Sequence, residues 1–167
     1  GIFYLYTREG RFIRWNKNLE TISGYSAREI RKMHPFDFYD TDEKAKIKKR
    51  ITQLFQEKVP GVELQLLTKQ KKKVPVYINS MAIIYEGEPC VVGMATDISQ
   101  LKKTQQELVE SEEAFKRLFQ ESSEAILILD GKKFIDCNEA TVSLLGYPSR
   151  EEFLFQPPWK RNSSRDG

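Results

Sequence analysis

Apolar residues recur at coiled-coil spacing between residues 97 and 120, a stretch that contains neither Gly nor Pro. The apolar stripe consists, in chain order, of Ile98, Leu101, Leu108, Phe115 and Phe119. Because good helix formers dominate the stretch, it predicts one long helix, with Ser99 as its N-cap. Gln105 and Glu112 interrupt the stripe. The pattern favours a short, imperfect coiled coil, and the alternative is a single amphipathic helix lying on its own domain.

The segments on either side of this helix resemble each other at an offset of 122 residues. The first copy contains FIRWNKNLETISGYSAREI at residues 12–30, and the second contains FIDCNEATVSLLGYPSREEF at residues 134–153. Both copies have an asparagine, Asn16 or Asn138, followed eight residues later by a Gly-Tyr pair. We therefore predict a domain at residues 1–98, a linker helix at residues 99–120 and a truncated second copy at residues 121–167.

The second copy ends before it reaches counterparts of the strands expected at residues 62–97. A two-stranded hairpin is marginal alone in water, so we expect this copy not to form a complete independent domain. We expect its apolar side, which includes Ile126, Ile128 and Leu145, to pack on another copy of the chain, with packing on the first domain or partial disorder as the alternatives. The tail from Gln156 onward is rich in Pro, Ser and charge and is expected to fray.

The first copy has the pattern of an α+β domain. Strands are expected at residues 2–6, 11–15, 62–68, 74–85 and 89–96. Short helices are expected after Asn16 and after Ser26, with these residues as N-caps, and a longer helix from about residue 41 to about Glu57. The expected buried stripe of that longer helix is Ala45 or Ile47, followed by Ile51, Leu54 and Phe55. Helices placed between two groups of strands predict one antiparallel sheet with helices on one side.

Composition and charge disfavour several classes of protein. Hydrophobic residues make up 40% of the chain, charged residues 31%, and the net charge is +3, as in ordinary globular proteins. Two basic clusters, Lys44–Arg50 and Lys69–Lys73, lie on different expected elements without interleaved aromatic residues, so no nucleic-acid binding is expected. No apolar run reaches the roughly 18 residues that cross a bilayer, so we expect no membrane contact. Cys90 and Cys137 form no disulfide framework, which favours a cytoplasmic location.

Several short motifs together resemble those of the PAS family of sensory domains. They are Asn16 after the second strand, Gly24-Tyr25-Ser26, His34-Pro35 and Asp97-Ile98-Ser99, the last being similar to the Asp-Ile-Thr signature before a PAS output helix. The order of strands and helices is also similar to that family. The resemblance implies a PAS-like five-stranded antiparallel sheet whose short helices form a ligand pocket over one face. It also implies a position upstream of a histidine kinase or a nucleotide cyclase.

The resemblance implies two sets of site residues. The expected ligand-pocket residues are Asn16, Tyr25, Met33, Phe38, Ile51, Leu64, Val76, Ile78 and Met94. The expected signal relay consists of Asp97, Ile98, Leu101, Leu108 and Phe115. The ligand itself is expected to be small, and the sequence does not identify it.

Residues for catalysis or cofactor binding are not recognisable in the sequence. The sole histidine, His34, has no nucleophile in a motif near it, so a structural role is favoured over catalysis. There is no phosphate-binding Gly-rich loop and no cluster with metal-ligand spacing. Haem-binding PAS relatives use a histidine on the long helix, and flavin-binding ones carry a cysteine in the segment corresponding to residues 27–34. Neither residue is present here, so we expect no enzyme activity, metal, haem or flavin in these residues.

The favoured function is a sensory and dimerisation module. It would detect a small ligand or partner and relay a change through the linker helix to an output domain of the histidine kinase or diguanylate cyclase type. A homodimer formed through the linker helix and the sheet region is expected. Two alternatives stay open: a cofactor-carrying redox, gas or light sensor, and a ligand-free structural spacer.

The purified protein is expected to be colourless, because the residues that would hold haem or flavin are missing. Its absorbance spectrum should show no band between about 400 and 450 nm, where only a bound cofactor absorbs. A band in that range that persists through purification would contradict this expectation and favour the cofactor-carrying sensor.

Overall fold

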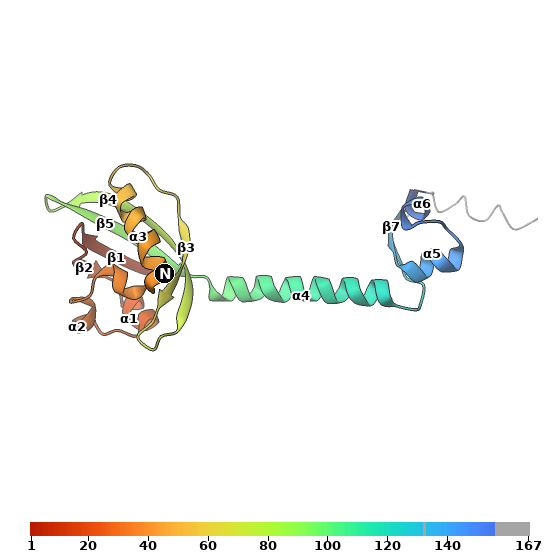
Figure 1. The fold of residues 1–167 in the computed structure, drawn as a ribbon, viewed down its shortest axis with the longest axis horizontal. Coiled ribbons are helices and arrows are strands. Elements are labelled where there is room, and N and C mark those ends of the chain that lie inside the picture. The colour runs from red at the N-terminus through yellow and green to blue at the C-terminus, as the bar shows by residue number, and fades with distance from the viewer. Residues whose placement is uncertain (132, 156–167) are drawn as a thin grey trace, which may run out of the picture. The chain divides into compact units, whose positions relative to one another are not determined.

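The computed structural model describes residues 1–131 and 133–155 and divides the chain into two compact units. The units are Gly1–Lys103 and Thr104–Gly167. Their boundary lies inside one long helix, α4, which spans Ser99–Glu121. Figure 1 shows α4 as a continuous helix.

The first unit is built on one antiparallel sheet of five strands in the order β2-β1-β5-β4-β3 (Figure 1). The strands are β1 (Ile2–Thr7), β2 (Phe12–Trp15), β3 (Val62–Leu67), β4 (Lys73–Tyr85) and β5 (Glu88–Asp97). The first and last strands pair at the centre of the sheet, where Tyr4 lies opposite Gly93. The predicted α+β class, with five antiparallel strands and short helices, is confirmed.

Four helical segments between β2 and β3 pack on one face of this sheet. They are α1 (Lys17–Ser23), α2 (Ala27–Ile30), the 3-10 helix η1 (Pro35–Phe38) and α3 (Thr41–Leu54). Each contributes at least one buried apolar side chain to the core: Leu19, Ile30, Phe38, and both Ile47 and Leu54 from α3. Burial of this apolar area against the inner sheet face is the main stabilising contribution to the unit.

Helix α3 ends at Leu54, three residues before the predicted end at Glu57. The amide groups of Gln56 and Glu57 both donate to the Gln53 carbonyl at 2.9 Å, so the chain turns there instead of continuing the helix. The predicted buried stripe left Ala45 and Ile47 as alternatives, and the structure selects one of them. Ile47 is buried and Ala45 is exposed, so Ile47 is the residue that faces the sheet.

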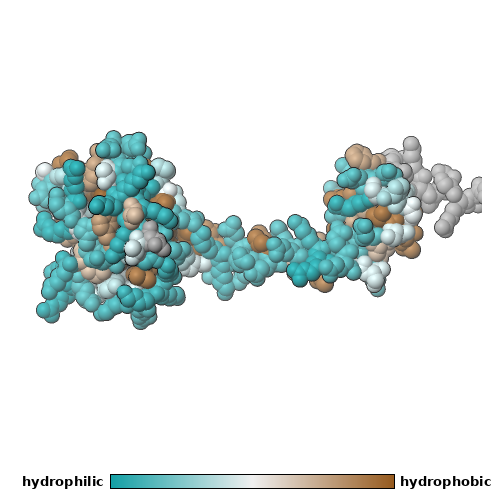
Figure 2. Space-filling model, in the orientation of Figure 1, coloured by the Kyte–Doolittle hydropathy of each residue, from teal (hydrophilic) through white to brown (hydrophobic). Residues whose placement is uncertain are grey.

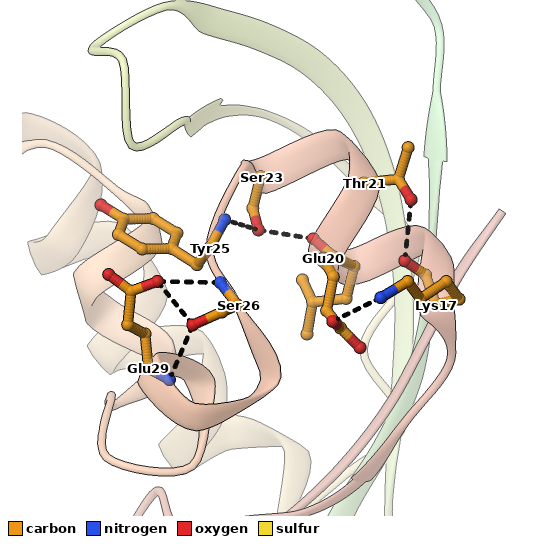
Figure 3. Close-up of polar contacts among 8 residues, drawn as sticks. Lys17, Glu20, Thr21, Ser23, Tyr25, Ser26 and Glu29 are labelled. Atoms are coloured by element: carbon orange, nitrogen blue, oxygen red, sulfur yellow. Dashed lines mark hydrogen bonds and ion pairs between the residues drawn. The ribbon is translucent and has the colours of Figure 1, made fainter.

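The connection between α1 and α2 is fixed by local hydrogen bonds (Figure 3). Gly24 ends α1 in the left-handed conformation, with φ of 76°, as its C-cap position requires. Ser26 and Glu29 form the predicted capping box, in which the Glu29 amide donates to Ser26 Oγ and the Ser26 amide donates to Glu29 Oε2. Both helix ends are therefore specified by residues within a few positions in the sequence.

Asn16 occupies the N-cap position of α1, but its side chain does not cap that helix. Its Oδ1 accepts from the Phe3 amide and its Nδ2 donates to the Gly1 carbonyl, both at 2.9 Å. In the second copy, Asn138 Oδ1 accepts from the amides of both Ile126 and Thr141, so it does cap its helix. Asn16 thus holds the predicted N-cap position without a side-chain cap bond, whereas in the second copy one amide oxygen serves both Ile126 and the helix.

The start of α4 also differs from the prediction of Ser99 as N-cap. The Lys102 amide donates to the Ile98 carbonyl at 2.9 Å, which places Ser99 inside the first helical turn. Asp97 supplies the side-chain acceptor instead, because its Oδ1 accepts from the Ser99 amide at 2.8 Å. Asp97 therefore ends β5, and its side chain binds the first residue of α4.

Thr104–Gly167 holds α4 from Thr104 onward and a second copy of the opening motif. Its further elements are β6 (Leu127–Asp130), β7 (Lys133–Cys137), α5 (Glu139–Leu145) and α6 (Arg150–Phe155). A small core of Cys137, Val142 and Phe153 forms where the two helices meet the hairpin. Whether this copy folds independently stays a prediction, and the predicted fraying from Gln156 onward falls outside the described residues.

The capping box makes Glu29 a measurable reporter of the fold. Lys69 Nζ donates to Glu29 Oε1 at 2.7 Å, and with the Ser26 amide and hydroxyl it lowers the Glu29 pKa to about 2. In Lys69→Gln we expect this pKa to move up toward the ordinary value of 4.5, as followed by carboxyl-carbon NMR titration.

The sign of the pH dependence follows from the lowered pKa. The stability that these contacts contribute is fully present when the pH is above the ordinary Glu29 pKa of 4.5. It is lost as the pH falls toward the folded-state pKa of about 2. Lys72→Gln is the matched control, because it removes one nearby exposed lysine and leaves the Lys69 contact in place. An unchanged Glu29 pKa in Lys69→Gln would contradict the assigned cause.

Candidate ligand-binding site

A cavity of about 50 Å³ lies between the inner sheet face and the helices of the first unit. The sheet contributes Ile2, Tyr4 and Tyr6 from β1, Phe12 from β2, Leu64 and Leu66 from β3, Ile78 and Ser80 from β4, and Ala95 from β5. The helical side contributes Leu19, Pro35, Phe38, Tyr39, Ile47, Arg50, Ile51 and Leu54. The walls are therefore mostly apolar, with a few polar groups among them.

The sequence places these residues on the cavity through two periodicities. On β4, Ile78 and Ser80 are two residues apart and so lie on the same face of the strand. On α3, Ile47, Ile51 and Leu54 recur at spacings of four and three and share one face of the helix. The cavity is the space where these two faces do not completely fill the gap between sheet and helices.

Aromatic rings form much of the packed wall. The rings of Phe12 and Phe38 meet edge-to-face with centroids 5.8 Å apart, and Tyr25 packs edge-to-face on Phe38 at 5.7 Å. Tyr4 and Tyr6 stack at 5.7 Å. Such pairs add to the stability gained from burial and hold the η1 segment against the sheet.

The polar groups gather around the Tyr4 hydroxyl. Tyr4 Oη and Ser80 Oγ are 2.9 Å apart and share a hydrogen bond. Room for the Tyr4 ring depends on Gly93, because a Cβ at that position would lie 2.4 Å from Tyr4 Oη. Burial raises the pKa of Tyr4, while the Ser80 hydrogen bond and the Arg50 charge oppose that rise. Burial also raises the pKa of Tyr39, so both hydroxyls are protonated at neutral pH and can donate.

The structure separates the nine expected pocket residues into groups. Phe38, Ile51, Leu64 and Ile78 line the cavity. The other residues do not line it: Tyr25, Met33 and Val76 belong to the surrounding core, and Asn16 binds the start of β1. Met94 is 58% exposed on the opposite sheet face, because its neighbour Ala95 points inward and strand residues alternate.

Five cavity residues with a polar group were not among the expected pocket residues: Tyr4, Tyr6, Tyr39, Arg50 and Ser80. Two of them carried a usable signal in the sequence. Tyr4 lies two residues after the buried Ile2, and Ser80 lies two residues after the buried Ile78. Nothing in the sequence indicated that Arg50 lines the cavity, because Arg50 belongs to a run of basic residues and such runs are usually exposed to solvent.

His34 is held by contacts to its own loop. Its Nδ1 accepts from the Phe36 amide at 3.2 Å, and its own amide donates to Asp37 Oδ2 at 2.7 Å. Its ring lies where a Cβ on Gly10 would be, only 1.9 Å from Nε2. Among the described residues, no group of three or more His, Cys, Asp or Glu side chains could hold a metal ion.

The start of α4 is connected to two strands that form cavity walls. The amide of Ile98 donates to the Pro75 carbonyl of β4 at 3.0 Å. Lys102 Nζ pairs with Glu63 Oε2 of β3 at 2.6 Å. Glu63 directly precedes the cavity residue Leu64, so the helix start and the cavity wall share a strand.

The expected relay residues differ in burial. Ile98 is buried where α4 leaves the sheet. The three seam residues further along α4 are exposed, at 66% for Leu101, 59% for Leu108 and 58% for Phe115. Phe119, at the far end of the stripe, is buried like Ile98, so within the described residues the exposed part of the seam runs from Leu101 to Phe115.

Family models identify what this arrangement belongs to. A model described as a PAS domain matches residues 1–100, and a second PAS domain model matches residues 113–164. The chain belongs to the PAS domain family. Its first unit is a PAS sensory domain, and the repeat detected in the sequence is a repeat of PAS character.

Solved PAS structures share this fold. A PAS domain from Desulfitobacterium hafniense is 24% identical, with 57% of this chain and 91% of that chain covered and a TM-score of 0.53. A PAS domain from Colwellia psychrerythraea is 20% identical, with 59% and 86% covered and a TM-score of 0.54. The PAS domain of the quorum-sensing receptor RpfR from Cronobacter turicensis, in complex with C12:0, is 19% identical, with 59% and 93% covered and a TM-score of 0.50. At these identities the likeness shows the fold alone.

No curated protein sequence matches the chain significantly. Among the described residues, no helix has both the length and the apolar character needed to cross a membrane.

The assignment of faces predicts different costs for two substitutions. Ile78→Ala removes a buried side chain from the cavity wall and is expected to lower the free energy of unfolding by about 2–5 kcal/mol. Met94→Ala, on the exposed outer face, is expected to change it by less than about 0.5 kcal/mol. Urea unfolding followed by circular dichroism measures both, and equal losses would show that the faces are assigned incorrectly.

Proposed function

We propose that the first PAS domain detects a small ligand in its cavity and relays the change through α4 to a downstream output domain. The observation that carries this proposal is the attachment of α4 to the cavity walls. Ile98 is bonded to β4 and Lys102 is paired with β3, the strands that contribute Ile78 and Leu64 to the cavity. A ligand that moves either strand therefore acts directly on the first turn of the helix.

The relay works by a change in the position or rotation of α4. The Lys102–Glu63 pair is exposed to solvent, so it is weak enough to be remade in a different geometry. The backbone bond from Ile98 and the Asp97 cap keep the helix start continuous with β5. A shift of β3 relative to β5 would thus move Lys102 while Asp97 and Ile98 stay in place, and α4 would rotate about its first residues.

The proposal includes a homodimer formed through α4 and the sheet region. Figure 2 shows isolated hydrophobic side chains on the mostly hydrophilic surface of α4. Leu101, Leu108 and Phe115 are exposed at seven-residue spacing, as the seam of a two-stranded coiled coil would be in a single chain. The outer sheet face offers further exposed apolar residues, Phe3, Tyr77, Met81 and Met94.

The output domain proposed is a histidine kinase or a diguanylate cyclase in the cytoplasm. Paired α4 helices would pass the change to such a domain by altering the relation between two protomers. We also propose that the first PAS domain works without haem or flavin. A cavity of about 50 Å³ supports this, because sites for such cofactors are several hundred Å³ in volume.

Self-association of α4 is the part of this proposal that a single experiment tests most directly. Leu108→Asp places a charge in the seam and is expected to weaken dimerisation by a few kcal/mol, because a carboxylate is costly to desolvate. Sedimentation velocity over a concentration series measures the dimer constant of the full chain.

Gln106→Asp is the matched control, because it adds the same charge to an exposed α4 position outside the seam. We expect its dimer constant to stay within about threefold of the unmutated value, since surface substitutions have small effects. A monomeric unmutated chain at high concentration, or equal weakening by both substitutions, would contradict the proposed relay.

A further inference from the structure

A polar corner interrupts the apolar cavity, and one of its donors has no partner. The corner consists of Tyr4, Tyr39, Arg50 and Ser80. Among the described residues, Arg50 Nε is buried without a hydrogen-bond partner. A buried charged donor that lacks an acceptor is destabilising, so a bound molecule that supplies an acceptor there would gain affinity.

The Arg50 side chain is held in place through another nitrogen of its guanidinium group. Its Nη2 donates to the carbonyl of Pro60, in the loop that leads into β3. Its charge acts on the Tyr4 hydroxyl, whose pKa it lowers against the effect of burial. The Tyr4 hydroxyl itself lies 2.9 Å from Ser80 Oγ. The guanidinium and these hydroxyls therefore form one group of donors at one end of the cavity.

We propose that this cavity binds a small monocarboxylate, with its carboxylate at Arg50 and its alkyl chain on the apolar wall. The Arg50 guanidinium would donate to one carboxylate oxygen, and the hydroxyls of Tyr4 or Tyr39 would donate to the other. The alkyl chain would contact Ile47, Ile51 and Leu64. This inference rests on the proposed function, in which the same cavity is the sensing site.

The volume of the cavity sets the size of the ligand. The volume of about 50 Å³ is the space open to the centres of water-sized spheres, so the room for atoms is larger than the roughly four spheres of equal volume and suits a molecule of about five or six non-hydrogen atoms. Propionate and butyrate have this size. A long-chain fatty acid does not fit without rearrangement of the packed aromatic wall, which includes Phe12 and Phe38.

A second buried atom without a partner, Glu43 Oε2, lies two turns before Arg50 on α3. It does not compete for the same ligand, because Glu43 does not line the cavity. Its other oxygen, Oε1, lies 3.7 Å from Lys46 Nζ, which partly offsets its charge. The Glu43 charge nevertheless acts on the corner residue Tyr39 and raises its pKa. Of the described residues that line the cavity, Arg50 alone carries a charge, so the lining favours an anion over an amine.

Three probes of similar size and different charge test this selectivity on the full, unmutated chain. They are propionate, its neutral analogue propionamide, and propylamine, each titrated at constant ionic strength and followed by amide NMR shifts. We expect propionate to bind with a dissociation constant at or below about 1 mM, at least about tenfold more tightly than either other probe. The shifts should centre on residues of the cavity, and octanoate should bind more weakly than propionate.

A pair of variants then tests the role of Arg50. Arg50→Gln is expected to weaken propionate binding by about tenfold or more, because it removes the charged donor. Lys49→Gln makes the same charge change at an exposed neighbouring position and is expected to leave affinity within about twofold. If Arg50→Gln does not fold, the selectivity among the three probes still decides the proposal.

Equal binding of propionate and propionamide, preference for propylamine, or no cavity shifts with propionate would each overturn the carboxylate assignment. None of these results bears on self-association through α4, whose seam residues do not line the cavity. The proposed relay is tested separately by the sedimentation of Leu108→Asp, so the two failures can be told apart.

Discussion

Pairing of β1 with β5 at the centre of the sheet is the constraint on which the rest of the first domain depends. It brings the first and last strands together, so the helices inserted between β2 and β3 must cross one face to let the chain return. It also fixes where the chain leaves the domain. Since β5 lies between β1 and β4, the residues after Asp97 start α4 within reach of Pro75 and Glu63.

The cavity exists because sheet and helices pack imperfectly at one place. Close packing of large aromatic side chains leaves a small space beside Tyr4, and Gly93 contributes by having no side chain there. Arg50 keeps a buried donor unpaired at that space. A protein selected for stability alone would fill the space and pair the donor, so both features favour a role in binding.

Comparison of the two copies separates what the shared motif specifies from what the complete domain adds. The asparagine after the second strand binds the backbone of the preceding strand in both copies, through the amides of Phe3 and Ile126. The Gly-Tyr pair ends the first helix in both, with Gly24 and Gly146 in the left-handed conformation. In the described residues, only the first copy has β3, β4 and β5, and those strands supply most of the sheet side of the cavity.

The sequence alone determined the fold class, most element ends and the connecting helix, because alternation, capping boxes and helix-breaking glycines act over a few residues. Ser26 and Glu29 are an example, since both partners of that box lie within one turn. Only the tertiary structure decided which face of each strand is inside. It showed that Ser80 lines the cavity and that Met94 lies on the exposed outer face. It also decided that Arg50, one of a run of basic residues, lines a cavity and has a buried Nε, because burial depends on elements distant in sequence.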